Sequence, residues 1–273
     1  MLRFPNAKIN LGLNIVSRRA DGYHDIETVF YPIGLRDVLE IVKGKHNDAT
    51  LTTYGRAIDC PTEKNLVMKA YRAMQKEYGL PPVDIFLQKN IPDGAGLGGG
   101  SADASTALLI LNDLFNIGAS NEHLATIAAK LGADCPFFIY NRPMLATGIG
   151  DILSDTEVSL KGKSLLLVKP SVSVPTAVAY SHVTPHKSDT DLQETLKLDV
   201  TEWEGLLKND FEPSVFAEYP KLGQLKEKIK NCGTVYASMS GSGSSIFGIF
   251  ESANMSAEAK EKIGIADSYV INL

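Results

Sequence analysis

Alternating apolar and polar residues predict a β-strand near the start of the chain. From Ala7 to Ile15 every second residue is apolar, and the residues between them are polar or glycine. This period of two is typical of a half-buried strand. Lys8 and Asn10 lie two positions apart on the polar face, so this face can either contact solvent or line a binding site.

The same kinds of pattern predict the other elements up to residue 140. The predicted strands are a run through Val29 and Phe30, and the segments Asp37–Val42, Ala49–Tyr54 and Val83–Lys89. The predicted helices have apolar residues three and four positions apart; they are a helix from Leu66 that Gly79 ends, Ser101–Phe115, and Asn121–Leu131 followed by Gly132. Residues 134–136 then form a short connection to an apolar run.

From Lys163 onward the predicted order becomes strand, helix, strand, strand, helix, strand. These elements are Leu165–Val168, helical stretches that include Lys221–Asn231, strands near Tyr236 and Ile246, the helix Ala257–Ile263 and the strand Tyr269–Leu273. This is the order of a ferredoxin-like unit. We therefore expect two domains, residues 1–157 and 158–273, with the polar segment 183–200 as a mobile surface connection.

Composition and charge limit the classes of partner. The chain has 273 residues and a formal net charge of −5, and it lacks the basic clusters that bind nucleic acids or anionic membranes. Cys60, Cys135 and Cys232 have neither disulfide-framework nor zinc-ligand spacing. No run reaches the about 18 apolar residues of a membrane span. We expect a cytoplasmic protein, either a monomer or a homodimer, without nucleic-acid or membrane partners.

A glycine-rich loop is the strongest local signal for chemistry. Residues 91–103 read IPDGAGLGGGSAD, with five glycines between Gly94 and Gly100, directly before a predicted helix. Such a loop lets backbone amides approach a ligand, and the helix start adds partial positive charge, so both features favour a phosphate group. The alternative is a flexible connector with a glycine-rich helix cap.

Two other glycine motifs fit this loop less well. Gly94, Gly96 and Gly99 satisfy G-x-G-x-x-G, which raises the alternative of a dinucleotide-dependent oxidoreductase. A Rossmann unit, however, needs a parallel strand after the helix, and a second helix is predicted there. A Walker A loop needs lysine before Ser101, where Gly100 stands, and the signatures of protein kinases are absent.

Four ordered segments resemble the motifs of the GHMP kinases. They read PNAKINL (residues 5–11), PDGAGLGGGSADASTA (92–107), ADCPFF (133–138) and SMSGSG (238–243). The resemblance implies a two-domain α+β fold, with an amino-terminal α/β domain like that of ribosomal protein S5 and a carboxy-terminal ferredoxin-like domain. It also implies a site between the domains, where ATP and Mg²⁺ serve to phosphorylate a small alcohol. With DGYH at residues 21–24, the chain is most similar to members whose alcohol carries a cytidine diphosphate group and serves isoprenoid synthesis.

The resemblance also assigns roles to individual residues. Asp134 is expected to be the general base, with Lys8 as its cationic partner. Without the resemblance, Asp134 would be interpreted as a turn former and Lys8 as a solvated charge. The residues expected to hold ATP are Pro92, Gly94, Gly96, Leu97, Gly98, Gly99, Gly100, Ser101 and Ala102, and Ser101 is also the candidate ligand of Mg²⁺.

The acceptor is expected to contact four residues. Asn10 would bind the polyol, Tyr23 and His24 the cytidine end, and Tyr180 would stack on the base, although Tyr180 fits an ordinary packing role equally well. Two alternatives stay open. The chain could phosphorylate another small alcohol, of the mevalonate or homoserine type, or it could be a nucleotide-binding or RNA-binding module, which its acidity disfavours.

Overall fold

The structure, a computed structural model, describes residues 1–186, 188 and 190–273. These residues form two compact units that alternate along the chain. Unit 1 contains residues 1–7, 35–93 and 98–142, and unit 2 contains residues 8–34, 94–97 and 143–273. The division into domains at residues 157 and 158 stays a prediction.

Unit 1 contains a four-stranded sheet. Its strand order is β1 (Leu2–Arg3), β4 (Val38–Lys43), β6 (Val83–Lys89) and β5 (Thr50–Gly55). β4 pairs antiparallel to β6, with Leu39 opposite Leu87, and β5 pairs parallel to β6, with Leu51 opposite Ile85. Every second residue of β6 is buried, as its alternating sequence predicts.

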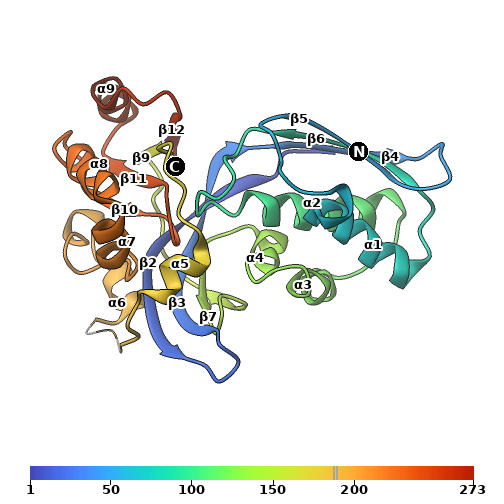
Figure 1. Ribbon diagram of the computed structural model, residues 1–273, viewed down its shortest axis with the longest axis horizontal. Coiled ribbons are helices and arrows are strands. Elements are labelled where there is room, and N and C mark those ends of the chain that lie inside the picture. Colours follow the sequence, from blue (N-terminus) through green and yellow to red (C-terminus); the bar gives the residue numbers. More distant parts are fainter. Residues whose placement is uncertain (187, 189) are drawn as a thin grey trace. The chain divides into compact units, whose positions relative to one another are not determined.

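The helices of unit 1 lie on one face of this sheet (Figure 1). They are the 3₁₀ helix η1 (Thr62–Lys64), α1 (Leu66–Tyr78), α2 (Gly99–Leu114), α3 (Asn121–Ala129) and α4 (Cys135–Tyr140). The side chain of Asn65 caps α1 by accepting a hydrogen bond from the Val67 amide. Gly79 ends α1 in the left-handed conformation, which confirms the predicted end of this helix.

One sheet of unit 2 contains the predicted first strand. Its order is β2 (Asn6–Arg18), β3 (His24–Arg36), β7 (Met144–Thr147) and β8 (Ile152–Asp155). The expectation that residues 7–15 are half-buried is wrong, because β2 is buried on both faces over these residues. Its polar side chains are therefore removed from bulk solvent.

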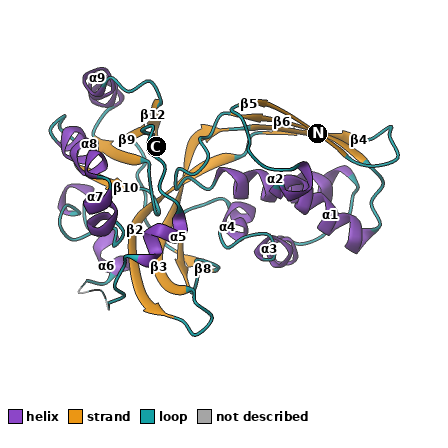
Figure 2. Ribbon diagram, in the orientation of Figure 1, coloured by secondary structure: helices purple, strands orange, loops and turns teal. Residues whose placement is uncertain are grey.

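The second sheet of unit 2 is ferredoxin-like. Its order is β10 (Tyr236–Met239), β11 (Ile246–Phe250), β9 (Ser164–Val168) and β12 (Ser268–Asn272), with every pair antiparallel. Two helices, α8 (Pro220–Lys230) and α9 (Ala253–Ile263), lie beside it (Figure 2) and bury Ile229 and Ile263 in the same core as Leu166 and Phe250. This order confirms the ferredoxin-like prediction and, with unit 1, the α+β fold class.

Shorter helices connect the strands of unit 2. They are α5 (Thr176–Ser181), α6 (Leu192–Lys197), η2 (Val200–Glu202) and α7 (Glu212–Glu218). The prediction of a surface connection over 183–200 is wrong where α6 forms, because Leu192 and Leu196 are buried. Lys187 and Asp189, also in that segment, lie outside the described residues. None of the described helices combines the length and the apolar character that crossing a membrane requires.

Candidate active site

Lys8 and Asn10 contact each other on β2 in unit 2. The side chain of Lys8 is buried, and its Nζ donates a hydrogen bond of 2.7 Å to Asn10 Oδ1. Asn10 Nδ2 donates in turn to Thr28 Oγ1 on β3, at 3.0 Å. The ammonium also lies 4.9 Å from the centre of the Phe30 ring, which is within cation–π range. Because little water screens this ammonium, it can strongly stabilise negative charge on a ligand.

Part of the glycine loop packs against the turn between β10 and β11 in unit 2. Ser240 Oγ donates to the Gly96 carbonyl at 2.9 Å, and the Ser245 amide donates to the Ala95 carbonyl at 3.3 Å. A Cβ atom at Gly96 would lie 1.9 Å from the Ser240 carbonyl oxygen. Close packing within the chain is therefore one reason for glycine at position 96, and the contact with Ser240 could not be predicted from the glycine pattern of the loop.

The other part of the loop begins α2 in unit 1. This helix starts at Gly99, two residues before the predicted Ser101, and Gly98 precedes it with a φ of 70°. Gly98 has no side chain that could cap the helix, so the amides of its first turn have no side-chain acceptor among the described residues. Uncapped amides and the positive end of the helix dipole together suit an anion, which is the property that phosphate binding requires.

Asp134 stands directly before α4 in unit 1. The predicted connection over residues 134–136 is wrong, because Cys135 and Pro136 already belong to this helix. The Asp134 side chain is half-buried and does not cap α4. Burial raises the pKa of the adjacent Cys135 thiol to about 11, a hydrogen bond with Ser101 opposes this shift, and the charge of Asp134 adds to it. The Ser101 hydroxyl and the Asp134 carboxylate thus both affect the pKa of the Cys135 thiol.

The donor set around Cys135 fits a magnesium ion better than a transition metal. Among the described residues, no three His, Cys, Asp or Glu side chains are grouped as a metal site. Mg²⁺ does not need such a group, because it is often bound by one or two protein oxygens together with substrate phosphates. The Ser101 hydroxyl is an oxygen donor of this kind.

An aromatic stack in unit 2 contains two of the residues predicted to bind the acceptor. The rings of His24 and Tyr180 stack with centroids 5.0 Å apart and an interplanar angle of 25°. Tyr180 also meets the Phe211 ring edge-on, at 4.8 Å. Tyr23 is 62% exposed and makes no ring contact with another described residue. The structure therefore brings His24 and Tyr180 together and leaves Tyr23 outside the stack.

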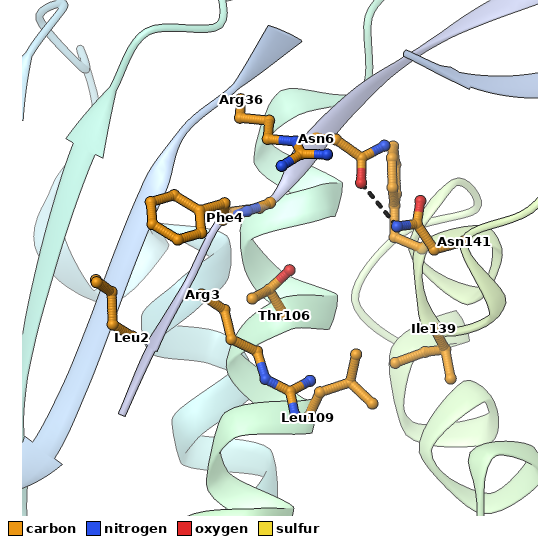
Figure 3. A pocket seen from close by; sticks show the side chains of 11 residues that line it. Leu2, Arg3, Phe4, Asn6, Arg36, Thr106, Leu109, Ile139 and Asn141 are labelled. Atoms are coloured by element: carbon orange, nitrogen blue, oxygen red, sulfur yellow. Dashed lines mark hydrogen bonds between the residues drawn. The ribbon is translucent and has the colours of Figure 1, made fainter. Parts of the chain in front are cut away.

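A separate pocket in unit 1 has a different chemical character. Its volume is about 390 Å³, and its lining includes Phe4, Asn6, Arg36 and Asn141 (Figure 3). Asn141 Nδ2 donates to Asn6 Oδ1 at 2.7 Å across it. The lining contains no carboxylate, histidine or cysteine, so this pocket offers no general base. None of the predicted site residues lines it.

Sequence reasoning missed a buried ionic cluster behind the glycine loop. Asp37, Lys89 and Asp103 meet in unit 1 and are nearly inaccessible to solvent. One signal was available: Lys89 continues the buried positions of β6, where a charged residue is rare unless it is paired. The predicted pairing of Lys8 in unit 2 with Asp134 in unit 1 stays a prediction.

Comparison with known proteins identifies the family. The model of the GHMP kinase N-terminal domain matches residues 65–142, and that of the GHMP kinase C-terminal domain matches residues 191–266. A relative from Bacteroides fragilis, named 4-diphosphocytidyl-2-C-methyl-D-erythritol kinase, is 52% identical over 252 residues, 92% of each chain. The chain belongs to the GHMP kinase family. A relative from Parabacteroides distasonis with the same name is 52% identical over 251 residues, again 92% of each chain.

Solved structures of GHMP kinases agree with this assignment. A crystal structure of 4-(cytidine 5'-diphospho)-2C-methyl-D-erythritol kinase is 31% identical, with a TM-score of 0.85, and covers 99% of this chain and 98% of that one. A homoserine kinase from Cytophaga hutchinsonii, 18% identical, has a TM-score of 0.74 and covers 98% of this chain and 94% of that one. At that identity the second match shows the shared fold alone.

Proposed function

We propose that this chain transfers the γ-phosphoryl group of ATP to the 2-hydroxyl of 4-diphosphocytidyl-2-C-methyl-D-erythritol. This reaction is a step of the non-mevalonate route to isoprenoid precursors. The observation that carries the substrate assignment is the 52% identity, over 92% of the chain, to relatives with that name. The geometry supports it, because an uncapped helix start, a buried ammonium and an aromatic stack offer contacts for phosphate, developing charge and base.

The acceptor hydroxyl has to lose its proton as its oxygen attacks the γ-phosphorus. In the proposed mechanism the Asp134 carboxylate accepts this proton, the bond between the γ-phosphorus and the β,γ-bridging oxygen breaks, and ADP leaves with that oxygen. Asp134 is suited to this because it supplies a half-buried carboxylate, a group that can accept a proton from a positioned hydroxyl. Lys8 would stabilise the negative charge on the transferring group, and Asn10 keeps the Lys8 ammonium in place.

The phosphates of ATP would lie against the glycine loop and the start of α2. Amides from Gly98 to Ser101 would donate to phosphate oxygens, as the uncapped helix start permits, whereas the Ala102 amide already donates to the Gly98 carbonyl at 2.9 Å and would only lie close to the phosphates. Mg²⁺, held by Ser101 and the phosphates, would neutralise charge on the β- and γ-phosphates. Gly94, which is exposed and has no side chain, would let a phosphate approach the loop backbone closely. Pro92, Gly96 and Leu97 would hold the loop in the shape that directs these amides.

The cytidine end of the acceptor would contact His24 and Tyr180. A neutral imidazole can hydrogen bond to the edge of cytosine, and the stacked rings present flat surfaces to the base. Tyr23, which is exposed beside His24, can close over a bound base without losing a contact to another ring. Binding energy from this remote end would position the reacting hydroxyl.

A coupled assay of ADP release tests the proposal. Equal concentrations of the cytidyl substrate, methylerythritol 4-phosphate, mevalonate and homoserine are compared at saturating ATP. We expect turnover with the cytidyl substrate and, because the remote contacts are lost, at least about 100-fold less with the others. Faster turnover with mevalonate or homoserine would show that the substrate assignment is wrong and that the chain is a kinase for another alcohol. No ADP with any alcohol would reject both.

A further inference from the structure

Three ionisable side chains are buried together in unit 1, outside the residues assigned to the reaction. Lys89 is the last residue of β6, Asp37 precedes β4, and Asp103 lies on α2. Lys89 Nζ is 2.5 Å from Asp37 Oδ2 and 2.8 Å from Asp103 Oδ2. The side chains are 2%, 0% and 3% exposed, respectively.

This cluster is poorly explained as a source of stability. Ion pairs in a dry interior gain little net free energy, because removing the charges from water offsets their attraction. Here two carboxylates share one ammonium, and Asp103 Oδ1 has no hydrogen-bond partner among the described residues. A cluster with an unsatisfied oxygen calls for another role, and fixing the arrangement of the chain is the best-supported use of such groups.

Asp37 holds the chain at the start of the glycine loop. Its Oδ1 accepts hydrogen bonds from the amides of Asn90, at 2.6 Å, and Ile91, at 2.8 Å. These two residues directly precede Pro92, the first residue of the predicted phosphate loop. Hydrogen bonds from amides to a buried carboxylate are strong and directional. The direction in which the chain leaves β6 is therefore set by Asp37.

Asp103 and Gly99 hold the chain at the other end of the loop. Asp103 lies one turn into α2 and is tied to Lys89. A Cβ atom at Gly99 would lie 2.9 Å from Ile91 Cγ2 and 3.3 Å from Lys89 Nζ, so the first turn of α2 packs directly on both residues. The two ends of the loop thus meet at one ammonium group.

We propose that Asp37, Lys89 and Asp103 form a loop-anchoring cluster that positions the phosphate loop for ATP. These are positioning residues, since they act through the backbone of Asn90, Ile91 and the first turn of α2. The inference rests on the proposed function only in taking ATP as the nucleotide. It does not depend on which alcohol is phosphorylated.

The variant Asp37→Asn tests this proposal. Asparagine has one oxygen and one NH₂ group, so it cannot accept from the two amides and from Lys89 at once. We expect the Kd and KM for ATP to rise about tenfold. The KM for the acceptor should stay within about twofold. Loss of folded protein alone would lower the apparent kcat and leave both KM values unchanged. A rise in the KM for ATP without a rise in the KM for the acceptor therefore distinguishes a positioning role from a loss of folded protein.

Asp84→Asn is the matched control. Asp84 also lies on β6 and accepts one hydrogen bond, from Thr50 Oγ1 at 2.8 Å, but it is remote from the loop. This control should bind ATP as the wild type does. Asp103→Asn is the second test variant, in case Asp37→Asn does not fold, because it retains the Asp37 contacts to Asn90 and Ile91. We expect it to raise the Kd for ATP by about threefold or more.

Calorimetric titration of the full chain with ATP gives the decisive values. If the folded test variants bind ATP within about twofold of Asp84→Asn, the loop-anchoring role is wrong. If the wild-type chain itself does not bind ATP, the proposed function fails and this inference fails with it. If the wild-type chain binds ATP and the test variants bind it with the same affinity, only the anchoring role is wrong.

Discussion

Replacing Gly94 by alanine, with Gly118→Ala as the control, separates the effect of a new side chain on ATP binding from the effect of backbone strain on stability. Gly94 has a φ of 58°, and Gly118, in another loop, has a φ of 74°. A Cβ atom at either position would meet no atom within 4 Å, and both residues are exposed. Gly94→Ala and Gly118→Ala therefore carry the same left-handed strain, about 1–2 kcal/mol each, without a clash. Valine at Gly99 would not separate the two effects, because its Cβ would lie 2.9 Å from Ile91 Cγ2.

The two variants should differ in their affinity for ATP. In the proposed site, a methyl group at position 94 keeps a phosphate away from one loop amide, and a hydrogen bond to a charged group contributes about 1.5–3 kcal/mol. The Kd for ATP should therefore rise about 10- to 150-fold in Gly94→Ala and stay unchanged in Gly118→Ala. Urea unfolding measures the strain, and calorimetry measures the Kd. Equal ATP affinity of the two variants would refute the proposed phosphate contact at this position.

Three other changes have outcomes that the structure makes specific. Asp134→Asn should lower kcat at least about 100-fold with little change in ATP affinity, and a variant that keeps more than about a tenth of the turnover would contradict the general-base role. Tyr180→Ala should raise the KM for the cytidyl substrate by about 2- to 10-fold. Tyr180→Phe keeps the stack with His24 and serves as the control. An equal KM for the cytidyl substrate in the two variants would exclude stacking of Tyr180 on the base. Alkylation at about pH 8, mapped by mass spectrometry, should modify the exposed Cys60 and spare Cys135. Burial raises the pKa of the Cys135 thiol to about 11, so only about 0.1% of this thiol is ionised at that pH. Rising pH should increase its labelling, and early labelling of Cys135 would contradict this protonation state.

Local sequence patterns predicted the elements whose ends have their own signals. β6 has the predicted bounds, because its alternating residues and the following glycine loop define both ends. Gly79 ends α1 as expected, since glycine adopts the left-handed conformation without strain. The ferredoxin-like sheet also follows from the order of its elements.

Features that depend on distant contacts could not be predicted in this way. Glycines have a low helix propensity, so Gly99 and Gly100 gave no local signal that α2 begins before Ser101. The meeting of Lys89 with Asp37 and Asp103 joins residues 52 and 14 positions apart, and no local pattern specifies such a contact. The roles of Asp134 and His24 came from the resemblance to the family, because an isolated aspartate or histidine fits many environments.

The most direct test of the central claim is phosphorus NMR of the reaction products. The purified chain is incubated with ATP, Mg²⁺ and 4-diphosphocytidyl-2-C-methyl-D-erythritol, and the new phosphorus signal is assigned through its coupling to the carbon atoms of the acceptor. The account predicts ADP and one new phosphomonoester on the 2-hydroxyl oxygen, with the cytidine diphosphate group intact. A phosphate on any other hydroxyl, or ADP formed with inorganic phosphate alone, would contradict it.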